Sequence, residues 1–325
     1  MIRVTPAFVF FALTAAAFGQ VGGPVMGYLP DGNSLRTIHG IPAAGSVGDA
    51  LSAGRKLTQV EVSPNQTLAL ATASDSGELW VLTPSADGSA VGSAPVGGAT
   101  AGANRFVFSP SGNAAALWFS STGHIQILQG IGLSSAPAVR DLDASFAGGD
   151  PAALAVSDDG LWAVGAWSSK VYAFGPNSQV NMLPVDGAAQ ALSFFHSKAD
   201  VAVFTPTQVV TFTDIAGSAA PTVLWSQSAE AAAATNPIAV GLAVSFDNAH
   251  LTIAGNTGAL FTFDLATGAG VAADCACVPT GLVGLGGSLY RLNGANAGAV
   301  KVFDAATNDV WFVPLAAPAE VGGQQ

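Results

Sequence analysis

The chain has 325 residues, half of them hydrophobic by count and only 10% charged. This apolar content excludes a wholly disordered chain, because it is enough to build a sizeable core. The formal net charge is −11, and the 10 basic residues are scattered along the sequence, which excludes the basic patch that nucleic-acid binding requires.

The first residues are typical of a secretory signal peptide. Arg3 is followed by an apolar stretch from Ala7 to Phe18, and Ala17–Gly19 fits the small-x-small pattern before a signal-peptidase site. The alternative is a transmembrane anchor, but the stretch is shorter than the roughly 20 residues that span a bilayer. We therefore expect residues 1–19 to be removed, leaving a secreted or periplasmic protein with no membrane span.

After this segment the chain consists of short apolar runs rich in Val, Leu, Phe and Thr, which predict an all-β protein. A turn sequence follows such a run again and again along the chain. These turns begin at Ser63, Ser109, Ser157, Phe195, Ser245 and Gly286. Their spacing averages near 45 residues, which indicates an array of small β-units.

The unit around residue 110 shows the expected strands most clearly. In chain order we expect strand a at Asn104–Phe108, strand b at Ala114–Phe119, strand c at His124–Leu128 and strand d near Ala138–Leu142. Strand b is apolar throughout and is therefore expected to be buried on both faces. Further c strands are expected at Glu78–Leu82, Lys170–Phe174, Val209–Phe212, Ala259–Phe263 and Ala299–Phe303.

Six complete units are expected between about Lys56 and Pro314. Before them, Val25–Leu29 and Leu35–Ile41 flank a Pro-Asp-Gly-Asn turn and predict a hairpin that lacks strands a and b. The Ala/Gly/Ser-rich segments Ala86–Gly102 and Ala229–Pro237 are expected to be variable loops.

The a–b turns contain Ser-Pro, Asp-Asp or Ser-Gly, and two c strands end in Phe-Asp before a turn, in FDLATG and FDAATN. With these features the chain resembles β-propellers of the WD-repeat or YVTN-repeat type. The resemblance covers roughly residues 25–315. It implies a propeller of four-stranded antiparallel blades, with seven blades favoured, one of them incomplete, and six as the alternative. We expect a single propeller domain over residues 20–318 and a flexible tail over 319–325. The Trp-Asp dipeptide of WD repeats is absent, so their hydrogen-bonded tetrad is not implied.

Candidate metal ligands do not form a recognisable motif. The histidines show no ligand spacing, although two of them fall at or beside equivalent a–b turns. The four are His39, His124, His196 and His250. Asp158-Asp159-Gly160 and Asp247-Asn248 resemble calcium-loop fragments but supply too few oxygens. Asp and Asn before Gly are ordinary turn residues, so turns are favoured and no metal site is predicted.

Cys275-Ala276-Cys277 predicts a local disulfide in an exported chain. In an extended strand the two Cα atoms would lie at the upper limit for a disulfide, so local bending is needed. Free thiols or a metal-binding pair are the alternatives, and redox catalysis is disfavoured because no helix follows.

No nucleophile or phosphate-loop motif is present, so neither catalytic nor cofactor-binding residues are predicted. The tryptophans are expected to pack between blades; they are Trp80, Trp118, Trp162, Trp167, Trp225 and Trp311. We expect a non-catalytic binding or scaffold propeller for a protein, peptide or glycan partner. The alternative is a lactonase-like hydrolase with a metal in the central channel, but Glu61 is the one glutamate in an innermost-type strand.

Overall fold

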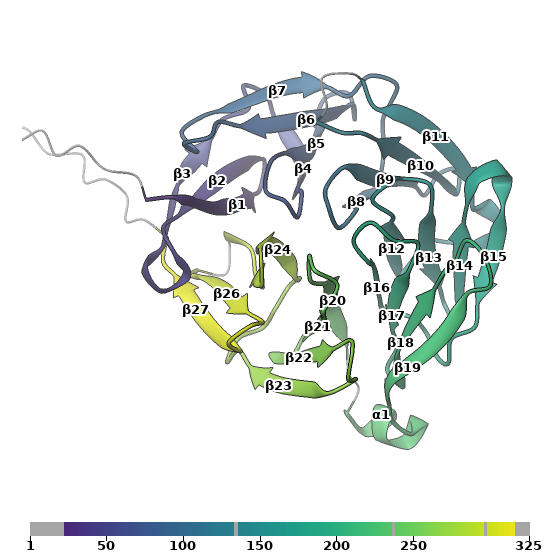
Figure 1. Cartoon of the computed structure of the whole chain (residues 1–325). Coiled ribbons are helices and arrows are strands. Elements are labelled where there is room, and N and C mark those ends of the chain that lie inside the picture. Colours follow the sequence, from purple (N-terminus) through teal and green to yellow (C-terminus); the bar gives the residue numbers. More distant parts are fainter. Residues whose placement is uncertain (1–22, 133–135, 236–237, 296–297, 316–325) are drawn as a thin grey trace, which may run out of the picture.

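The computed structural model describes residues 23–132, 136–235, 238–295 and 298–315. Within them, seven antiparallel sheets stand as blades around a central axis (Figure 1), so the predicted seven-bladed propeller is confirmed. The predicted signal peptide of residues 1–19 and the tail of residues 319–325 lie outside the described residues. No helix in the described part of the chain is long and apolar enough to cross a membrane.

The strands of each blade run from the axis outward in chain order. Blade 1 contains β1 (Val25–Asp31), β2 (Ser34–His39) and β3 (Ser46–Leu51). Blade 2 contains β4 (Leu57–Val62), β5 (Ala69–Ala73), β6 (Leu79–Pro84) and β7 (Val91–Pro95). Blade 3 contains β8 (Arg105–Phe108), β9 (Ala114–Phe119), β10 (His124–Gln129) and β11 (Ala138–Asp143). Blade 4 contains β12 (Ala153–Val156), β13 (Ala163–Trp167), β14 (Lys170–Phe174) and β15 (Val180–Leu183).

The remaining three blades follow the same plan. Blade 5 contains β16 (Ala191–Phe194), β17 (Val201–Phe204), β18 (Gln208–Thr213) and β19 (Ala220–Ser226). Blade 6 contains β20 (Ala239–Val244), β21 (His250–Gly255), β22 (Ala259–Asp264) and β23 (Gly270–Asp274). Blade 7 contains β24 (Val283–Gly286), β25 (Leu289–Arg291), β26 (Val300–Asp304) and β27 (Asp309–Val313).

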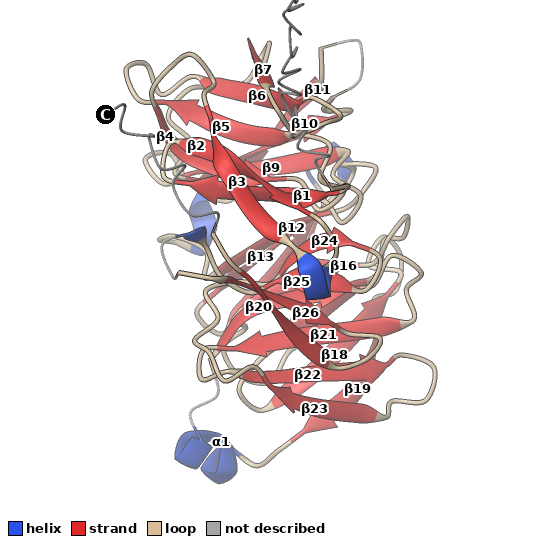
Figure 2. Ribbon diagram, turned by 90° about the vertical axis from the view of Figure 1, so that its left-hand side faces the viewer, coloured by secondary structure: helices blue, strands red, loops and turns tan. Residues whose placement is uncertain are grey.

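Two expected loops contain regular structure. The segment 86–102 includes β7, the outermost strand of blade 2. Most side chains of β7 are exposed and several of its residues are Gly, Ser or Ala. The strand therefore has no hydrophobic pattern by which the sequence could predict it. The segment from residue 229 begins with the helix α1 (Ala229–Thr235), which projects from the rim between blades 5 and 6 (Figures 1 and 2).

The first blade differs from the prediction. The N-terminal hairpin was expected to lack strands a and b, but β1 lies against the innermost strands β4 and β24 and is itself strand a. Within the described residues, the strand that blade 1 lacks is the outermost one. The expectation was wrong because an a–b hairpin and a c–d hairpin have the same local pattern, and only contacts with neighbouring blades distinguish them.

Each junction between neighbouring blades, which we call a seam, contains one cluster of buried apolar side chains. The b strands supply both of their faces to these clusters. In β9, Ala114, Ala116 and Trp118 face blade 4, while Ala115, Leu117 and Phe119 face blade 2. The predicted burial of this strand on both faces is confirmed, and it explains why the b strands are continuously apolar.

The ring closes where blade 1 meets blade 7. Leu29, Ile38 and Val47 of blade 1 pack with Val302 and Val313 of blade 7. The outer edge of β3 carries a single parallel bridge from Val47 to Leu315, with the Val47 N–H donating to the carbonyl of Pro314 at 2.9 Å. The closure therefore depends mainly on side-chain packing, because the two termini do not share a complete sheet within the described residues.

Candidate functional site: the turn face and the central channel

The a–b turns lie together on one face of the ring, which we call the turn face. Three of them use the same internal hydrogen bond, from the Ser hydroxyl to the side-chain oxygen two residues later. The bonds join Ser63 to Asn65, Ser157 to Asp159 and Ser245 to Asp247, each at 2.6 Å. The Ser245 hydroxyl holds the pKa of Asp247 below its usual range. These side-chain oxygens accept hydrogen bonds within their own turns, in agreement with the prediction that Asp159 and Asp247 are ordinary turn residues.

Asp158 acts differently from its neighbour Asp159, because it connects three blades. Its Oδ1 accepts the backbone N–H of Ser111 in blade 3 at 2.7 Å, and its Oδ2 accepts that of Ser197 in blade 5 at 2.8 Å. Only a carboxylate offers two charged acceptors in this geometry. This role was not predicted, since both aspartates fit an ordinary turn.

Similar bonds continue around the turn face, and we call the whole set the turn belt. Asn248 of blade 6 accepts the His196 N–H at 2.8 Å and donates to the His196 carbonyl at 3.1 Å. Gln66 of blade 2 accepts the Tyr28 N–H of blade 1 at 2.7 Å and donates to the Gly284 carbonyl of blade 7 at 2.6 Å. The turn belt thus fixes the positions of the turns relative to one another.

His196 and His250 lie on the turn face, as their positions beside equivalent turns suggested. The His196 Nδ1 atom is 3.8 Å from Asp158 Oδ2. Burial lowers the pKa of His196, and the attraction of Asp158 only partly opposes this. Among the described residues, no three His, Cys, Asp or Glu side chains gather closely enough to hold a metal ion.

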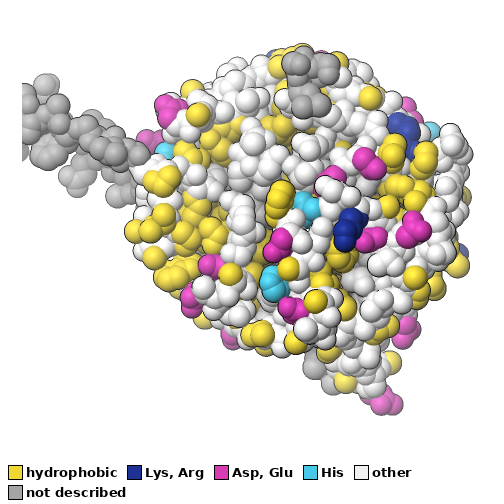
Figure 3. Space-filling view, in the orientation of Figure 1, with side chains coloured by type: hydrophobic (Ala, Val, Ile, Leu, Met, Phe, Trp, Pro, Cys, Tyr) yellow, Lys and Arg dark blue, Asp and Glu magenta, His cyan; other side chains and the backbone are white. Residues whose placement is uncertain are grey.

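Phe246 is the most exposed large apolar side chain of the turn face. Its side chain is 73% exposed, and its ring centroid lies 5.0 Å from that of His196. Asp247 is bonded within the turn and Asn248 is bonded to the neighbouring blade, so the aromatic ring is presented on a fixed backbone. Figure 3 shows acidic, basic and histidine side chains near the centre of the face, among mostly uncharged ones.

The central channel opens beside these turns and has a volume of about 780 Å³. Each innermost strand is hydrogen-bonded to one neighbour only, so the backbone groups of its other edge face the channel. Three charged side chains from different blades line the wall. They are Glu61 on β4, Arg105 on β8 and Arg291 on β25.

The charges of the channel do not neutralise one another by direct contact. Burial raises the pKa of Glu61, and Arg291 and Arg105 oppose this from a distance. Arg105 donates to the carbonyls of Pro151 and Ala152 at 3.2 and 3.1 Å. Arg291 Nη1 donates to the Asn293 carbonyl at 2.8 Å. Among the described residues, none of the three takes part in an ion pair within 4.0 Å.

The predicted packing of the tryptophans between blades is observed for five of the six, because Trp225 and Trp311 also pack against seam clusters and only Trp80 does not. Trp118 and Trp167 meet edge to face between blades 3 and 4, with centroids 5.8 Å apart, and Trp162 is buried between blades 4 and 5. Trp80 is only half-buried and lies under Arg55, whose guanidinium carbon is 3.3 Å from the ring centroid. Trp225 and Trp311 are also half-buried.

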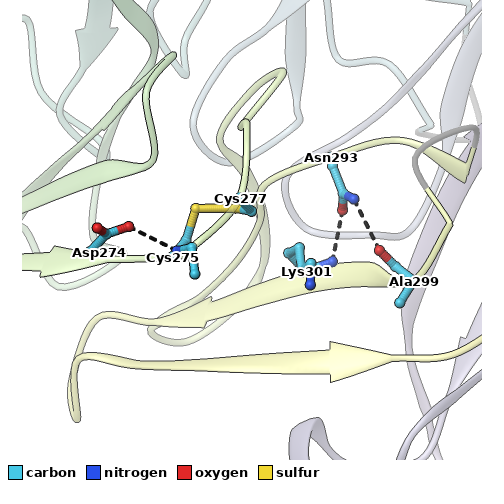
Figure 4. Close-up of a disulfide and its surroundings, with 7 residues drawn as sticks. Asp274, Cys275, Cys277, Asn293, Ala299 and Lys301 are labelled. Atoms are coloured by element: carbon cyan, nitrogen blue, oxygen red, sulfur yellow. Dashed lines mark hydrogen bonds between the residues drawn. A yellow bond between two sulfur atoms is a disulfide. The ribbon is translucent and has the colours of Figure 1, made fainter.

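Cys275 and Cys277 are joined by a disulfide in the connection from blade 6 to blade 7 (Figure 4). Their Cα atoms are 5.1 Å apart, closer than an extended strand allows, because Ala276 has a φ of 45°. They follow β23 and are not part of a strand. Thiol titration of the denatured, unreduced protein tests the disulfide directly.

In the same view, the Asn293 side chain accepts a hydrogen bond from the Lys301 N–H and donates one to the Ala299 carbonyl.

Comparison with known proteins identifies the fold. No protein-family model matches the chain. No curated protein matches it in sequence. Sqt1 of Saccharomyces cerevisiae is 13% identical, with a TM-score of 0.55 over 94% of this chain and 92% of that one. The β-propeller domain of Cps50 (Swd1) of Myceliophteria thermophila is 14% identical, with a TM-score of 0.49 over 65% of this chain and 70% of that one.

The likeness to Sqt1 agrees with the predicted β-propeller fold and identifies no characterised subfamily. Two groups of candidate functional residues were not predicted. Arg105 and Arg291 were not considered, since isolated arginines in β-strands carry no motif. Phe246 fits a turn sequence, and only the folded ring shows that it stands exposed beside the channel.

Proposed function

We propose that this chain is an exported, non-catalytic propeller that binds a protein or peptide through its turn face. The supporting observation is Phe246, an exposed aromatic ring on a turn that is tied to blade 5 by hydrogen bonds from the Asn248 side chain to the His196 backbone. Rigid aromatic side chains are the usual anchors of protein interfaces, because they bury a large apolar area at little cost in conformational entropy.

Proline residues in three other turns extend this surface around the channel. Pro30, Pro64 and Pro110 are partly exposed there. Proline has no side-chain rotamers to lose on binding and no N–H that must be satisfied. The turn face therefore offers a partly apolar rim of low conformational entropy, with polar groups of the turn belt between its members.

The lactonase-like alternative requires several oxygen or nitrogen ligands that converge on a metal in the channel. Among the described lining residues, Glu61 is the one carboxylate, and His196 stands at the mouth beside Phe246. This donor set is too small to favour the hydrolase over a binding module.

The interface is tested with a pair of matched variants. The chain is immobilised, incubated with secreted or periplasmic proteins of the source organism, and any captured protein is purified for a direct binding titration. We expect Phe246→Ser to weaken binding by tenfold or more, as for an interface anchor. Phe146→Ser is the control, because Phe146 is 56% exposed but lies in the connection between blades 3 and 4. Equal affinity of both variants and the parent would contradict the proposed interface.

Export is tested separately by expressing the whole chain with its own N-terminus. We expect the recovered protein to begin at Gln20 and to be found outside the cytoplasm, because residues 1–19 have the pattern of a signal peptide. Recovery of protein that still begins at Met1 inside the cell would contradict export.

A further inference from the structure

The central channel carries an excess of positive charge in a protein that is otherwise acidic. Arg105 and Arg291 line it together with a single carboxylate, Glu61, whereas the whole chain has a net charge of −11. Burying a guanidinium is unfavourable unless a partner of opposite charge is near. An unbalanced pair of arginines in a cavity therefore indicates a missing anion.

Arg291 shows this most clearly. Its side chain is only 7% exposed, yet its Nε atom is buried without a hydrogen-bond partner in the structure. One terminal nitrogen is held by the Asn293 carbonyl, which keeps the guanidinium in place. The other terminal nitrogen, Nη2, has no hydrogen-bond partner among the described residues and is not enclosed like Nε, so it is the donor that an acceptor bound in the cavity can reach.

Glu61 does not fill that position. It forms no ion pair within 4.0 Å with either arginine, and burial raises the pKa of its carboxyl group. Arg105 approaches from blade 3 and is anchored by the carbonyls of Pro151 and Ala152. The two arginines leave a surplus of about one positive charge when Glu61 is ionised, which suits a singly charged ligand.

The rest of the wall determines what kind of anion fits. Partly exposed apolar side chains line the cavity on several blades. They include Val107, Phe108, Val240, Leu282 and Val283. A volume of about 780 Å³, mostly apolar walls and a few fixed polar groups are typical of a site for a small organic molecule.

We propose that the central channel binds an organic carboxylate with an apolar body, whose carboxylate is held by Arg105 and Arg291. The site lies inside the ring and does not depend on the protein-binding role of the turn face. The carboxylate can belong to a free acid or to the C-terminus of a peptide, since both present the same group.

Glu61 gives the site a pH dependence. Its negative charge repels an incoming carboxylate, so binding favours the protonated form of Glu61 and becomes tighter as the pH falls, over the range in which the carboxylate of the ligand stays ionised. Glu61→Gln removes this repulsion without removing a hydrogen-bonding side chain. We expect that variant to bind more tightly than the parent at pH 7 and to lose most of the pH dependence.

The test is a calorimetric titration of the purified chain with sodium octanoate, and with octanamide as the uncharged control. We expect octanoate to bind and octanamide to bind at least tenfold more weakly. Arg105→Met and Arg291→Met should each weaken octanoate binding by roughly tenfold to a hundredfold, because each removes a charged hydrogen-bond donor. Arg55→Met is the matched control, since Arg55 lies exposed over Trp80 on the outer part of blade 2.

A second pair of probes separates the two sources of the carboxylate. A short apolar peptide with a free C-terminus is compared with its C-terminal amide, and tighter binding of the peptide than of octanoate would indicate a peptide end. If Arg291→Met fails to fold, the weaker octanoate binding expected of Arg105→Met and the tighter binding expected of Glu61→Gln still test whether the channel binds carboxylates. No binding of either carboxylate, equal affinity for octanoate and octanamide, or tighter binding of inorganic phosphate would overturn the proposal.

Discussion

The seam between blades 3 and 4 and the closure seam between blades 1 and 7 are both built on apolar clusters. They differ in the polar contacts that cross them. At the first seam, Trp118 Nε1 donates to Asp150 Oδ1 at 2.7 Å and Arg140 Nη2 donates to the Leu161 carbonyl at 2.7 Å. At the closure seam, the backbone bond from Val47 to Pro314 stands at the edge of the packed core.

The difference follows from chain connectivity. Blades 3 and 4 are consecutive, so their contacts form between residues that are already close along the chain. Blades 1 and 7 come from opposite ends of the chain, and their contact requires the closure of a loop that contains the whole ring. We infer that the closure seam is the place where the ring opens first, and the following substitutions test this difference.

The largest effect is expected at the seam of blades 3 and 4. Trp118→Ala should lower the free energy of unfolding by about 3–5 kcal/mol, because it leaves a cavity beside Trp167. Urea denaturation followed by circular dichroism measures this. Trp118→Phe, which keeps an aromatic ring but loses the bond to Asp150, is the control and should cost less. A loss below about 1 kcal/mol for Trp118→Ala would show that this seam is not tightly packed.

The turn belt should give the next largest effect. Asp158→Ala leaves the N–H groups of Ser111 and Ser197 without their acceptor, and we expect a loss of about 2–3 kcal/mol. Asp159→Ala is the matched control in the same turn, because the Asp159 side chain is exposed and accepts hydrogen bonds from Ser157 and Leu161 of its own turn. If both substitutions have the same small effect in urea denaturation, the belt does not stabilise the ring.

At the closure seam, the informative residue is Gln66, which bonds both blade 1 and blade 7. Gln66→Ala should cost about 1–2 kcal/mol, since the two neutral hydrogen bonds to blades 1 and 7 are lost together with a longer one to the Ser63 carbonyl of its own turn. Hydrogen exchange measured by mass spectrometry should show faster exchange in β1–β3 and little change in β9. Uniformly faster exchange across all blades would mean that the ring opens as one unit and that its seams are equivalent.

The smallest effect on stability is expected from Glu61. It lies on β4 of blade 2, between blade 1 and blade 3. Because its pKa in the folded state is raised, its contribution to stability is present below the ordinary pKa and is lost as the pH rises through the raised value. Glu61→Gln should therefore be more stable than the parent at pH 7, and the difference should vanish in acid. Thermal unfolding of both proteins at several pH values measures this difference in stability. If Glu61→Gln were less stable than the parent at pH 7, ionised Glu61 would stabilise the fold, which contradicts the prediction.

The sequence alone was sufficient to predict most strands of the ring. Strands β8–β11 lie within one residue of their expected bounds, and the b strand Ala114–Phe119 matches fully. This succeeded because strand alternation, continuous apolar runs and turn residues are local properties of the chain. The prediction failed for β7, whose exposed Gly, Ser and Ala residues carry no such pattern.

The candidate site was accessible from the sequence only in part. Glu61 was predicted to lie on an innermost strand and does so, and the a–b turns were recognised as turns. Which aspartate of Asp158-Asp159 joins the blades depends on how neighbouring turns meet, and no local pattern encodes that. The same holds for Arg105 and Arg291, which belong to blades 3 and 7.

The sequence by itself therefore determined the β-units, their repeat length and the burial of their central strands, because each unit repeats the same local constraints. Only the tertiary structure decided that β1 is the innermost strand of its blade, since that depends on β4 and β24 from distant units. It alone also brought Glu61, Arg105 and Arg291 to one channel. Convergence of this kind arises from ring closure, which joins residues that lie far apart along the chain.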